Sequence, residues 1–264
     1  MKTSSSKILT TIDKDIAQIT INNQERRNAM SLEMWQALAD AMRQLTQEST
    51  VRVVIIKGAG EKAFISGADI SEFESKRSSQ AQRDEYENAF DDVQTQLANF
   101  DKPVIAMIKG YCIGGGLALA LNTDIRIATE DAMFGIPAAK LGLGYGFAAI
   151  KTLTSIVGPS HTKDILFSAR FLNAGEALRI GLINFVVSAE QLEERVFDYA
   201  NTIVSNAPLT IKSIKAAVGE VVKNPGQTNV NYIEDLVNDC FLSEDYKEGR
   251  QAFMEKRKPQ FKGF

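Results

Sequence analysis

Two glycine-containing segments combine small side chains with an accessible backbone. FISGADI spans residues 64–70 and YCIGGGLALA spans residues 111–120. Each follows an apolar run typical of a buried strand, and ligands of open α/β folds bind at the carboxyl ends of strands. Backbone N–H groups at glycines are unhindered donors, and two of them aimed at one point form an oxyanion hole. The same glycines could also serve only to let a helix pack closely on a strand, so both interpretations stay open.

The elements expected to carry these segments predict an α/β fold. Strand patterns cover residues 8–12, 16–21, 51–58, 103–110 and 124–129. Helical spacing is predicted for residues 32–47 after the N-cap Ser31, for 80–99, and from about 147 onward. NAGE (173–176) and SAEQ (188–191) have the capping-box arrangement of a helix start. We therefore expect residues 1–195 to form a core of strand–strand–helix units that carries the site, and residues 196–264 to form a C-terminal helical region.

Other glycine clusters are weaker candidates for a ligand loop. Gly58, Gly60 and Ala63 fit the GxGxxA dinucleotide fingerprint, but no helical pattern follows them. Gly142, Gly144 and Gly146, in the sequence LGLGYG (141–146), are typical of a turn. The chain has no GK[ST] sequence, which excludes a Walker A loop.

The composition is that of an ordinary globular protein. The chain has 264 residues, 44% of them hydrophobic, and a net charge of −3, so its charge gives no reason to expect a nucleic-acid or membrane partner. Cys112 and Cys240 lack CxxC spacing, which argues against a disulfide scaffold or a metal site. With no leader or spanning segment expected, we predict a cytoplasmic protein.

Five blocks, in order along the chain, carry a resemblance to a known family. They are ITINNQERRNAMS (19–31), KAFISGADISEF (62–73), KPVIAMIKGYCIGGGLALALNTDIRIAT (102–129), FGIPAAKLGL (134–143) and SEDYKEGRQAFMEKRKPQFKG (243–263). Over almost its whole length the sequence resembles the enoyl-CoA hydratase/isomerase (crotonase) superfamily. The resemblance implies a spiral of ββα units with a C-terminal trimerisation region, a homotrimer or a hexamer (a dimer of trimers), and an acyl-CoA thioester as substrate, with no separate cofactor.

The resemblance also implies site residues. The oxyanion hole falls on the backbone N–H groups of Ala68 and Gly115, which makes these two residues catalytic. Arg26, Arg27 and Ala29 lie where the family meets the CoA phosphates and adenine. Other implied substrate-binding residues are those along the pantetheine path and in the tail that often reaches the adenine, sometimes of a neighbouring subunit: Ala63, Phe64, Gly67, Asp69, Ile70, Gly114, Lys258 and Phe261. Alternatively, Arg26 and Arg27 are a solvated charge pair, and Asp69 caps a helix.

Two positions depart from the family pattern. Hydratases of the family carry glutamates that activate water, where this chain has Ala118 and Ala138. A positioned acid or base contributes about 10²–10⁴-fold, so two losses should cripple water addition, while a backbone oxyanion hole would survive. Loss of CO₂ from a malonyl-type acyl-CoA forms an enolate without proton removal. Tyr145 resembles a tyrosine of some family decarboxylases, and is the third catalytic candidate.

Replacement groups have competing interpretations. Tyr145 could instead be a turn residue with its hydroxyl in water. Cys112 fits a small buried hydrophobe better than a nucleophile, and His161 fits a structural residue. A carboxylate of Glu74, Asp84 or Glu85 could replace the glutamates, or these residues could be solvated. Three functions therefore stay open: an acyl-CoA enzyme of the superfamily, a decarboxylase, and a non-catalytic binder of CoA thioesters.

Overall fold

The main sheet of the molecule is six-stranded and largely parallel. The structure is a computed structural model that describes residues 5–69, 79–223 and 226–264. The strands lie in the order β1-β2-β3-β5-β7-β10, and β1 pairs antiparallel with β2 while the other pairs are parallel. Their bounds are β1 (Ile8–Asp13), β2 (Ile16–Ile21), β3 (Val53–Gly58), β5 (Val104–Ile108), β7 (Ile125–Thr129) and β10 (Phe185–Val187).

A second sheet of short strands lies beside the ends of the first. Its order is β4-β6-β8-β9, parallel except for β9. The strands are β4 (Ala63–Ile65), β6 (Tyr111–Ile113), β8 (Met133–Gly135) and β9 (Leu172–Asn173). Strands β4, β6 and β8 follow β3, β5 and β7 after a few residues, which gives the expected ββα repeat. Since β3 leads into a strand and not a helix, the dinucleotide fingerprint at Gly58 is excluded.

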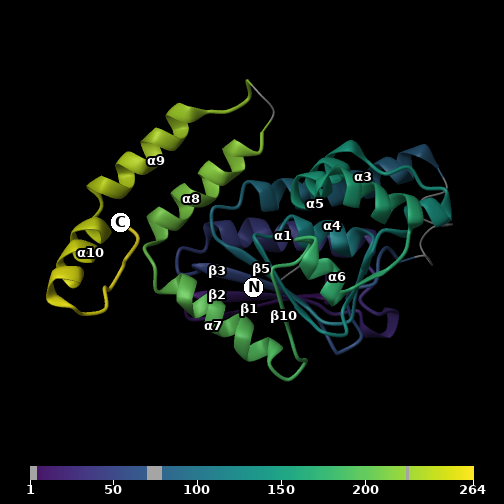
Figure 1. Ribbon diagram of the computed structural model, residues 1–264, viewed down its shortest axis with the longest axis horizontal. Coiled ribbons are helices and arrows are strands. Elements are labelled where there is room, and N and C mark those ends of the chain that lie inside the picture. Colours follow the sequence, from purple (N-terminus) through teal and green to yellow (C-terminus); the bar gives the residue numbers. More distant parts are fainter. Residues whose placement is uncertain (1–4, 70–78, 224–225) are drawn as a thin grey trace.

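Helices cover both faces of the main sheet. Helices α1, α3, α4 and α5 gather on one face, and α7 crosses the other (Figure 1). The helices are α1 (Leu32–Gln47), α3 (Gln80–Ala98), α4 (Gly115–Leu121), α5 (Phe147–Ser168), α6 (Ala174–Arg179), α7 (Leu192–Val204), α8 (Pro208–Val221), α9 (Val230–Leu242) and α10 (Glu244–Glu255), with 3-10 turns η1 (Gln24–Arg26) and η3 (Pro137–Leu141). In the described part of the chain, no helix combines the length and apolar character needed to cross a bilayer.

Local capping explains where several helices begin. The Ser31 hydroxyl accepts the Met34 N–H, and Asn173 forms a reciprocal capping box with Glu176, as predicted. The prediction of a capping box at residues 188–191 is wrong, because α7 begins at Leu192 with no side-chain cap. Instead, the carboxylate of Glu190 accepts hydrogen bonds from its own backbone N–H and from the Ser188 hydroxyl. These two bonds lower the pKa of the Glu190 carboxyl group.

The last three helices extend away from the sheets. Helices α8 and α9 run beside each other, and α10 lies farthest out (Figure 1). The expected division at residue 195 falls inside α7, whose Leu192, Val196 and Ala200 pack on the main sheet. Whether the two parts are separate units stays a prediction. The tail returns to the core, where Arg52 donates to the carbonyls of Val204 (3.1 Å) and Phe261 (2.7 Å).

Candidate active site

The segment after β4 leaves one backbone donor facing outward. Met30 N–H donates to the Gly67 carbonyl, and Asp69 N–H donates to the Met30 carbonyl, both at 2.9 Å. In this bridge between Met30 and Ala68, successive N–H groups point to opposite sides, so the Ala68 N–H points away from Met30. It has no acceptor among the described residues. Half-buried Ala68 therefore offers a free donor at the rim of the core.

The three glycines at the start of α4 differ in their backbone conformation and in the space around them. Gly114 has φ 56° and ψ −120°, a backbone conformation that favours glycine. At Gly116 a Cβ would lie 2.6 Å from the Cβ and carbonyl oxygen of Ile65, so glycine is required for the helix to pack on β4. At Gly115 a Cβ would lie 3.2 Å from Trp35 Cζ2. The packing interpretation thus holds for Gly116, and leaves Gly115 for another role.

Gly115 offers the second free donor. As the first residue of α4 it has no intrahelical acceptor for its N–H, and no other acceptor occurs in the parts of the chain that are described. The two segments adjoin, because β4 and β6 pair in parallel and a Cβ on Gly114 would lie 3.9 Å from Gly67 Cα. Two unpaired N–H groups on adjoining segments can stabilise negative charge on an oxygen between them.

Several apolar and aromatic residues of the core lie near these donors. Ala118 is 4% exposed on α4, while Ala138, Tyr145 and Phe90 are half-buried against the same core cluster as Ala68. Burial raises the pKa of Tyr145 to about 12, so its hydroxyl stays protonated at neutral pH. The protonated hydroxyl can donate a hydrogen bond, and a catalytic role for Tyr145 stays a prediction.

The remaining reactive groups predicted from sequence lie apart from the donors or in the core. Cys112 is fully buried, and burial raises the pKa of its thiol, so it is not a thiolate nucleophile. His161 is exposed on α5, after the kink at Gly158. Asp84 and Glu85 face solvent in a groove between α1 and α3. Glu74 lies outside the described residues.

The predicted substrate-binding residues near the donors fall into exposed and buried groups. Gly67 and Gly114 adjoin each other, as described above. Exposed Arg26 pairs with Asp69, whose carboxylate lies 3.7 Å away, so Asp69 has an ionic partner. Ala29, Ala63 and Phe64 are 8%, 1% and 0% exposed, so Ala63 and Phe64 offer almost no surface to a ligand. Ile70 lies outside the described residues.

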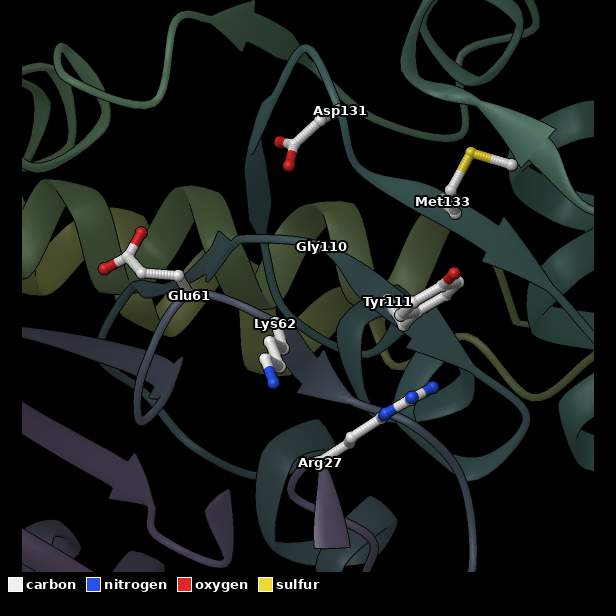
Figure 2. A pocket seen from close by; sticks show the side chains of 7 residues that line it. All are labelled: Arg27, Glu61, Lys62, Gly110, Tyr111, Asp131 and Met133. Carbon is white, nitrogen blue, oxygen red and sulfur yellow. The ribbon is translucent and has the colours of Figure 1, made fainter. Parts of the chain in front are cut away.

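Arg27 lines a cavity of about 380 Å³ (Figure 2). The other lining residues are Glu61, Lys62, Gly110, Tyr111, Asp131 and Met133. They lie where β4, β6 and β8 begin, whereas Ala68 and Gly115 follow the other ends of β4 and β6. Lys62 was not predicted as a site residue, although it directly precedes β4, which leads to the Ala68 donor. Tyr111, which begins β6, was considered only as a neighbour of the glycines.

The tail residues do not reach the donors within one chain. The Phe261 carbonyl is bound by Arg52, which precedes β3, while Gly58 ends that strand on the side of the donors. Six strand residues span roughly 20 Å. Lys258 is exposed three residues before Phe261. Their contact with an adenine bound to a neighbouring copy stays a prediction.

Three aromatic residues behind the donors were not predicted as site residues. Trp35 lies against Gly115, and its ring meets Phe90 edge-on at 5.0 Å between centroids. Its indole N–H donates to the hydroxyl of Tyr86 at 2.7 Å. Trp35 and Tyr86 are 51 residues apart in the sequence, so no local pattern could have paired them.

Comparison with known proteins identifies the family. The family model described as enoyl-CoA hydratase/isomerase matches residues 11–263. The chain belongs to this family. It is an acyl-CoA enzyme of the hydratase type by family, as the resemblance implied.

Individual relatives agree with this assignment. The chain is 36% identical to the short-chain-enoyl-CoA hydratase of Clostridium acetobutylicum, over 92% of each chain. It is 35% identical to the crotonyl-CoA hydratase of Syntrophomonas wolfei, over 94% of this chain and 95% of the relative. The crystal structure of an enoyl-CoA hydratase from Bacillus anthracis superposes with a TM-score of 0.92 at 30% identity, covering 98% of this chain and all of the other. These matches confirm the predicted crotonase fold.

Proposed function

We propose that the protein binds an acyl-CoA thioester with its carbonyl oxygen between the N–H groups of Ala68 and Gly115, and stabilises the enolate that forms there. The observation that supports this role is the pair of adjoining backbone donors, neither of which has an acceptor among the residues that the structure describes. Preorganised donors lower the energy of an oxyanion without reorganisation, and removing one such donor typically costs about 10²–10³-fold in kcat.

We further propose that water addition by two carboxylates is not the main reaction. By the resemblance, the glutamates of family hydratases fall at Ala118 and Ala138, and both alanines lie in or against the main hydrophobic core. Relatives named as hydratases, at 36% and 35% identity, favour hydration. The two alanines oppose it, because each missing acid or base is worth about 10²–10⁴-fold.

Decarboxylation of a malonyl-type acyl-CoA is the second candidate, favoured by Tyr145. In this reaction the bond between the α-carbon and the carboxylate breaks and CO₂ leaves. The electron pair of the broken bond stays on the α-carbon and is delocalised into the thioester carbonyl, which forms the enolate. A proton from solvent then completes the α-carbon. A tyrosine with a pKa of about 12 is neutral at pH 7 and can donate a hydrogen bond to the substrate carboxylate before it leaves.

Assays with a panel of acyl-CoA substrates would distinguish the proposed reactions. Purified protein would be assayed for hydration of crotonyl-CoA, for CO₂ release from malonyl-, methylmalonyl- and ethylmalonyl-CoA, and for deuterium exchange at the α-carbon of saturated acyl-CoAs. Enolate chemistry predicts CO₂ release or α-exchange, with slow hydration. Hydration at rates ordinary for the family would contradict the second proposal, and binding without turnover on every thioester would show a non-catalytic binder.

We also infer that the chain assembles as a homotrimer or a dimer of trimers. The resemblance implies this assembly, and helices α8–α10 expose large apolar side chains that a monomer would leave in water, namely Val218, Val221, Phe241, Leu242 and Phe253. Light scattering on the purified protein would give a trimer or hexamer mass. A monomer at micromolar concentration would contradict this inference.

A further inference from the structure

We propose that Tyr86 and Trp35 are positioning residues that hold both donors of the candidate oxyanion hole. The two come from different helices, Trp35 from α1 and Tyr86 from α3, and both are buried, with 1% and 8% exposure. This inference rests on the proposed role of Ala68 and Gly115. It goes further by assigning a function to side chains that do not themselves reach the substrate oxygen.

Tyr86 connects to the Ala68 donor through a single carbonyl group. An indole N–H can only donate, so the Tyr86 hydroxyl accepts from Trp35 at 2.7 Å, and its own proton is directed to the Met30 carbonyl at 3.2 Å. The Met30 carbonyl also accepts the Asp69 N–H at 2.9 Å. That second bond fixes the backbone next to Ala68. Loss of the hydroxyl would leave the segment of Ala68 with one fewer restraint.

Trp35 connects to the Gly115 donor through packing. Its ring lies against Gly115, so close that a Cβ added to Gly115 would be 3.2 Å from Trp35 Cζ2. Phe90 packs on the Trp35 ring in an edge-to-face arrangement. The hydrogen bond to Tyr86 fixes the rotation of the indole, because its N–H would otherwise be buried without a partner. One hydrogen-bonded pair therefore restrains the backbone at both donors.

The arrangement differs from ordinary core packing in its use of polar groups. Buried tyrosine hydroxyls and indole N–H groups need partners, and here they bond to each other and to the carbonyl of Met30, which bridges to Ala68. Donors of an oxyanion hole must stay within a few tenths of an ångström of their productive positions to be effective. Restraints of this kind are what two short backbone segments need.

The test uses Tyr86→Phe, with Tyr199→Phe as the matched control. Tyr199 lies on α7 against Phe185, on the opposite face of the main sheet. The probe is a dimethylaminocinnamoyl-CoA thioester, whose absorbance moves to longer wavelength when its carbonyl is polarised by hydrogen bonds. Its affinity and that of free CoA would be measured alongside, since the affinity for CoA depends on contacts away from the carbonyl.

The expected result is a red shift in the wild type and in Tyr199→Phe, and at most about half of that shift in Tyr86→Phe. The affinity for free CoA should change less than about threefold, and kcat on an accepted substrate should fall about 10-fold while KM changes little. If Tyr86→Phe does not fold, Trp35→Phe removes the indole N–H while keeping an apolar ring, and should likewise weaken the shift.

Failure of this inference and failure of the proposed function give different results. An equal red shift in wild type and both variants would overturn the positioning role while leaving the oxyanion hole intact. No red shift in the wild type, despite binding of the probe, would overturn the oxyanion hole itself and the positioning role with it. A loss of CoA affinity that parallels the loss of red shift would show a general structural role and overturn the positioning assignment.

Discussion

Trp35 of α1 packs directly against the backbone of Gly115, so closely that a Cβ on Gly115 would lie 3.2 Å from Trp35 Cζ2. The contact is tight but does not by itself require glycine, and the positive φ that favours glycine is found at Gly114 and not at Gly115. A side chain at Gly115 must displace the ring or the backbone that carries the candidate donor. The contact therefore links the packing of α1 to the chemistry proposed for α4.

Replacing Gly115 by alanine is expected to lower activity more than stability. The added methyl forces Trp35 or the Gly115 N–H to shift by a few tenths of an ångström, and a misplaced donor should reduce kcat about 10-fold or more. The measurement is kcat on the best acyl-CoA, together with thermal unfolding.

Gly219→Ala is the matched control for this substitution. Gly219 lies within α8, and a Cβ there meets nothing within 4 Å. Alanine should be tolerated and should stabilise the helix by up to about 1 kcal/mol. Equal activities of the two variants would contradict the role of the Gly115 backbone.

Restoring a carboxylate at Ala138 is expected to increase hydration. Ala138→Glu places an acid where the resemblance puts a glutamate of the family hydratases, and a positioned base is worth about 10²-fold or more. Crotonyl-CoA hydration should rise at least about 10-fold. The exposed neighbour Ala139, changed to glutamate, controls for added charge. If Ala138→Glu leaves hydration unchanged, position 138 does not face the reacting carbons.

Tyr145 should lower the stability of the protein at high pH. Its folded pKa of about 12 lies above the ordinary value of 10.0, so its contribution is fully present below pH 10 and is lost as the pH rises toward 12. Urea unfolding of wild type and Tyr145→Phe between pH 9 and 12 would show the difference. A steeper alkaline loss in Tyr145→Phe than in the wild type would contradict the burial of the hydroxyl.

The two cysteines are expected to react differently with thiol reagents. Cys112 is fully buried, and burial raises the pKa of its thiol, whereas Cys240 is half-buried on α9, away from the donors. Brief treatment of native protein with iodoacetamide should modify Cys240 first and leave catalysis intact. Peptide mass spectrometry would locate the label, and rapid labelling of Cys112 with loss of activity would contradict this order.

The sequence predicted the features that depend on local patterns. The cap at Ser31, the buried strands and the short helix after Gly114 follow from periodicity and side-chain chemistry within a few residues. The triple glycine shows the limit of such reasoning. Packing and ligand binding were alternatives from spacing alone. The structure assigns packing to Gly116 and backbone conformation to Gly114, and the N–H of Gly115 has no acceptor in the described part of the chain.

Features formed by distant segments could not be read from the sequence. The hydrogen bond from Trp35 to Tyr86 joins two helices, and no local sequence pattern around either residue predicts this pairing. Burial of Phe64 depends on the helices that cover β4, so its apolar character alone could not separate a core residue from a substrate contact. The place of Phe261 at the far end of β3 depends on the path of the whole tail.

The most direct test of the proposed oxyanion hole is an experimental structure with a non-reactive acyl-CoA bound. The account predicts that the thioester oxygen lies about 2.7–3.1 Å from the backbone nitrogens of both Ala68 and Gly115. An ordered thioester whose oxygen lies beyond hydrogen-bond distance of both nitrogens would contradict it.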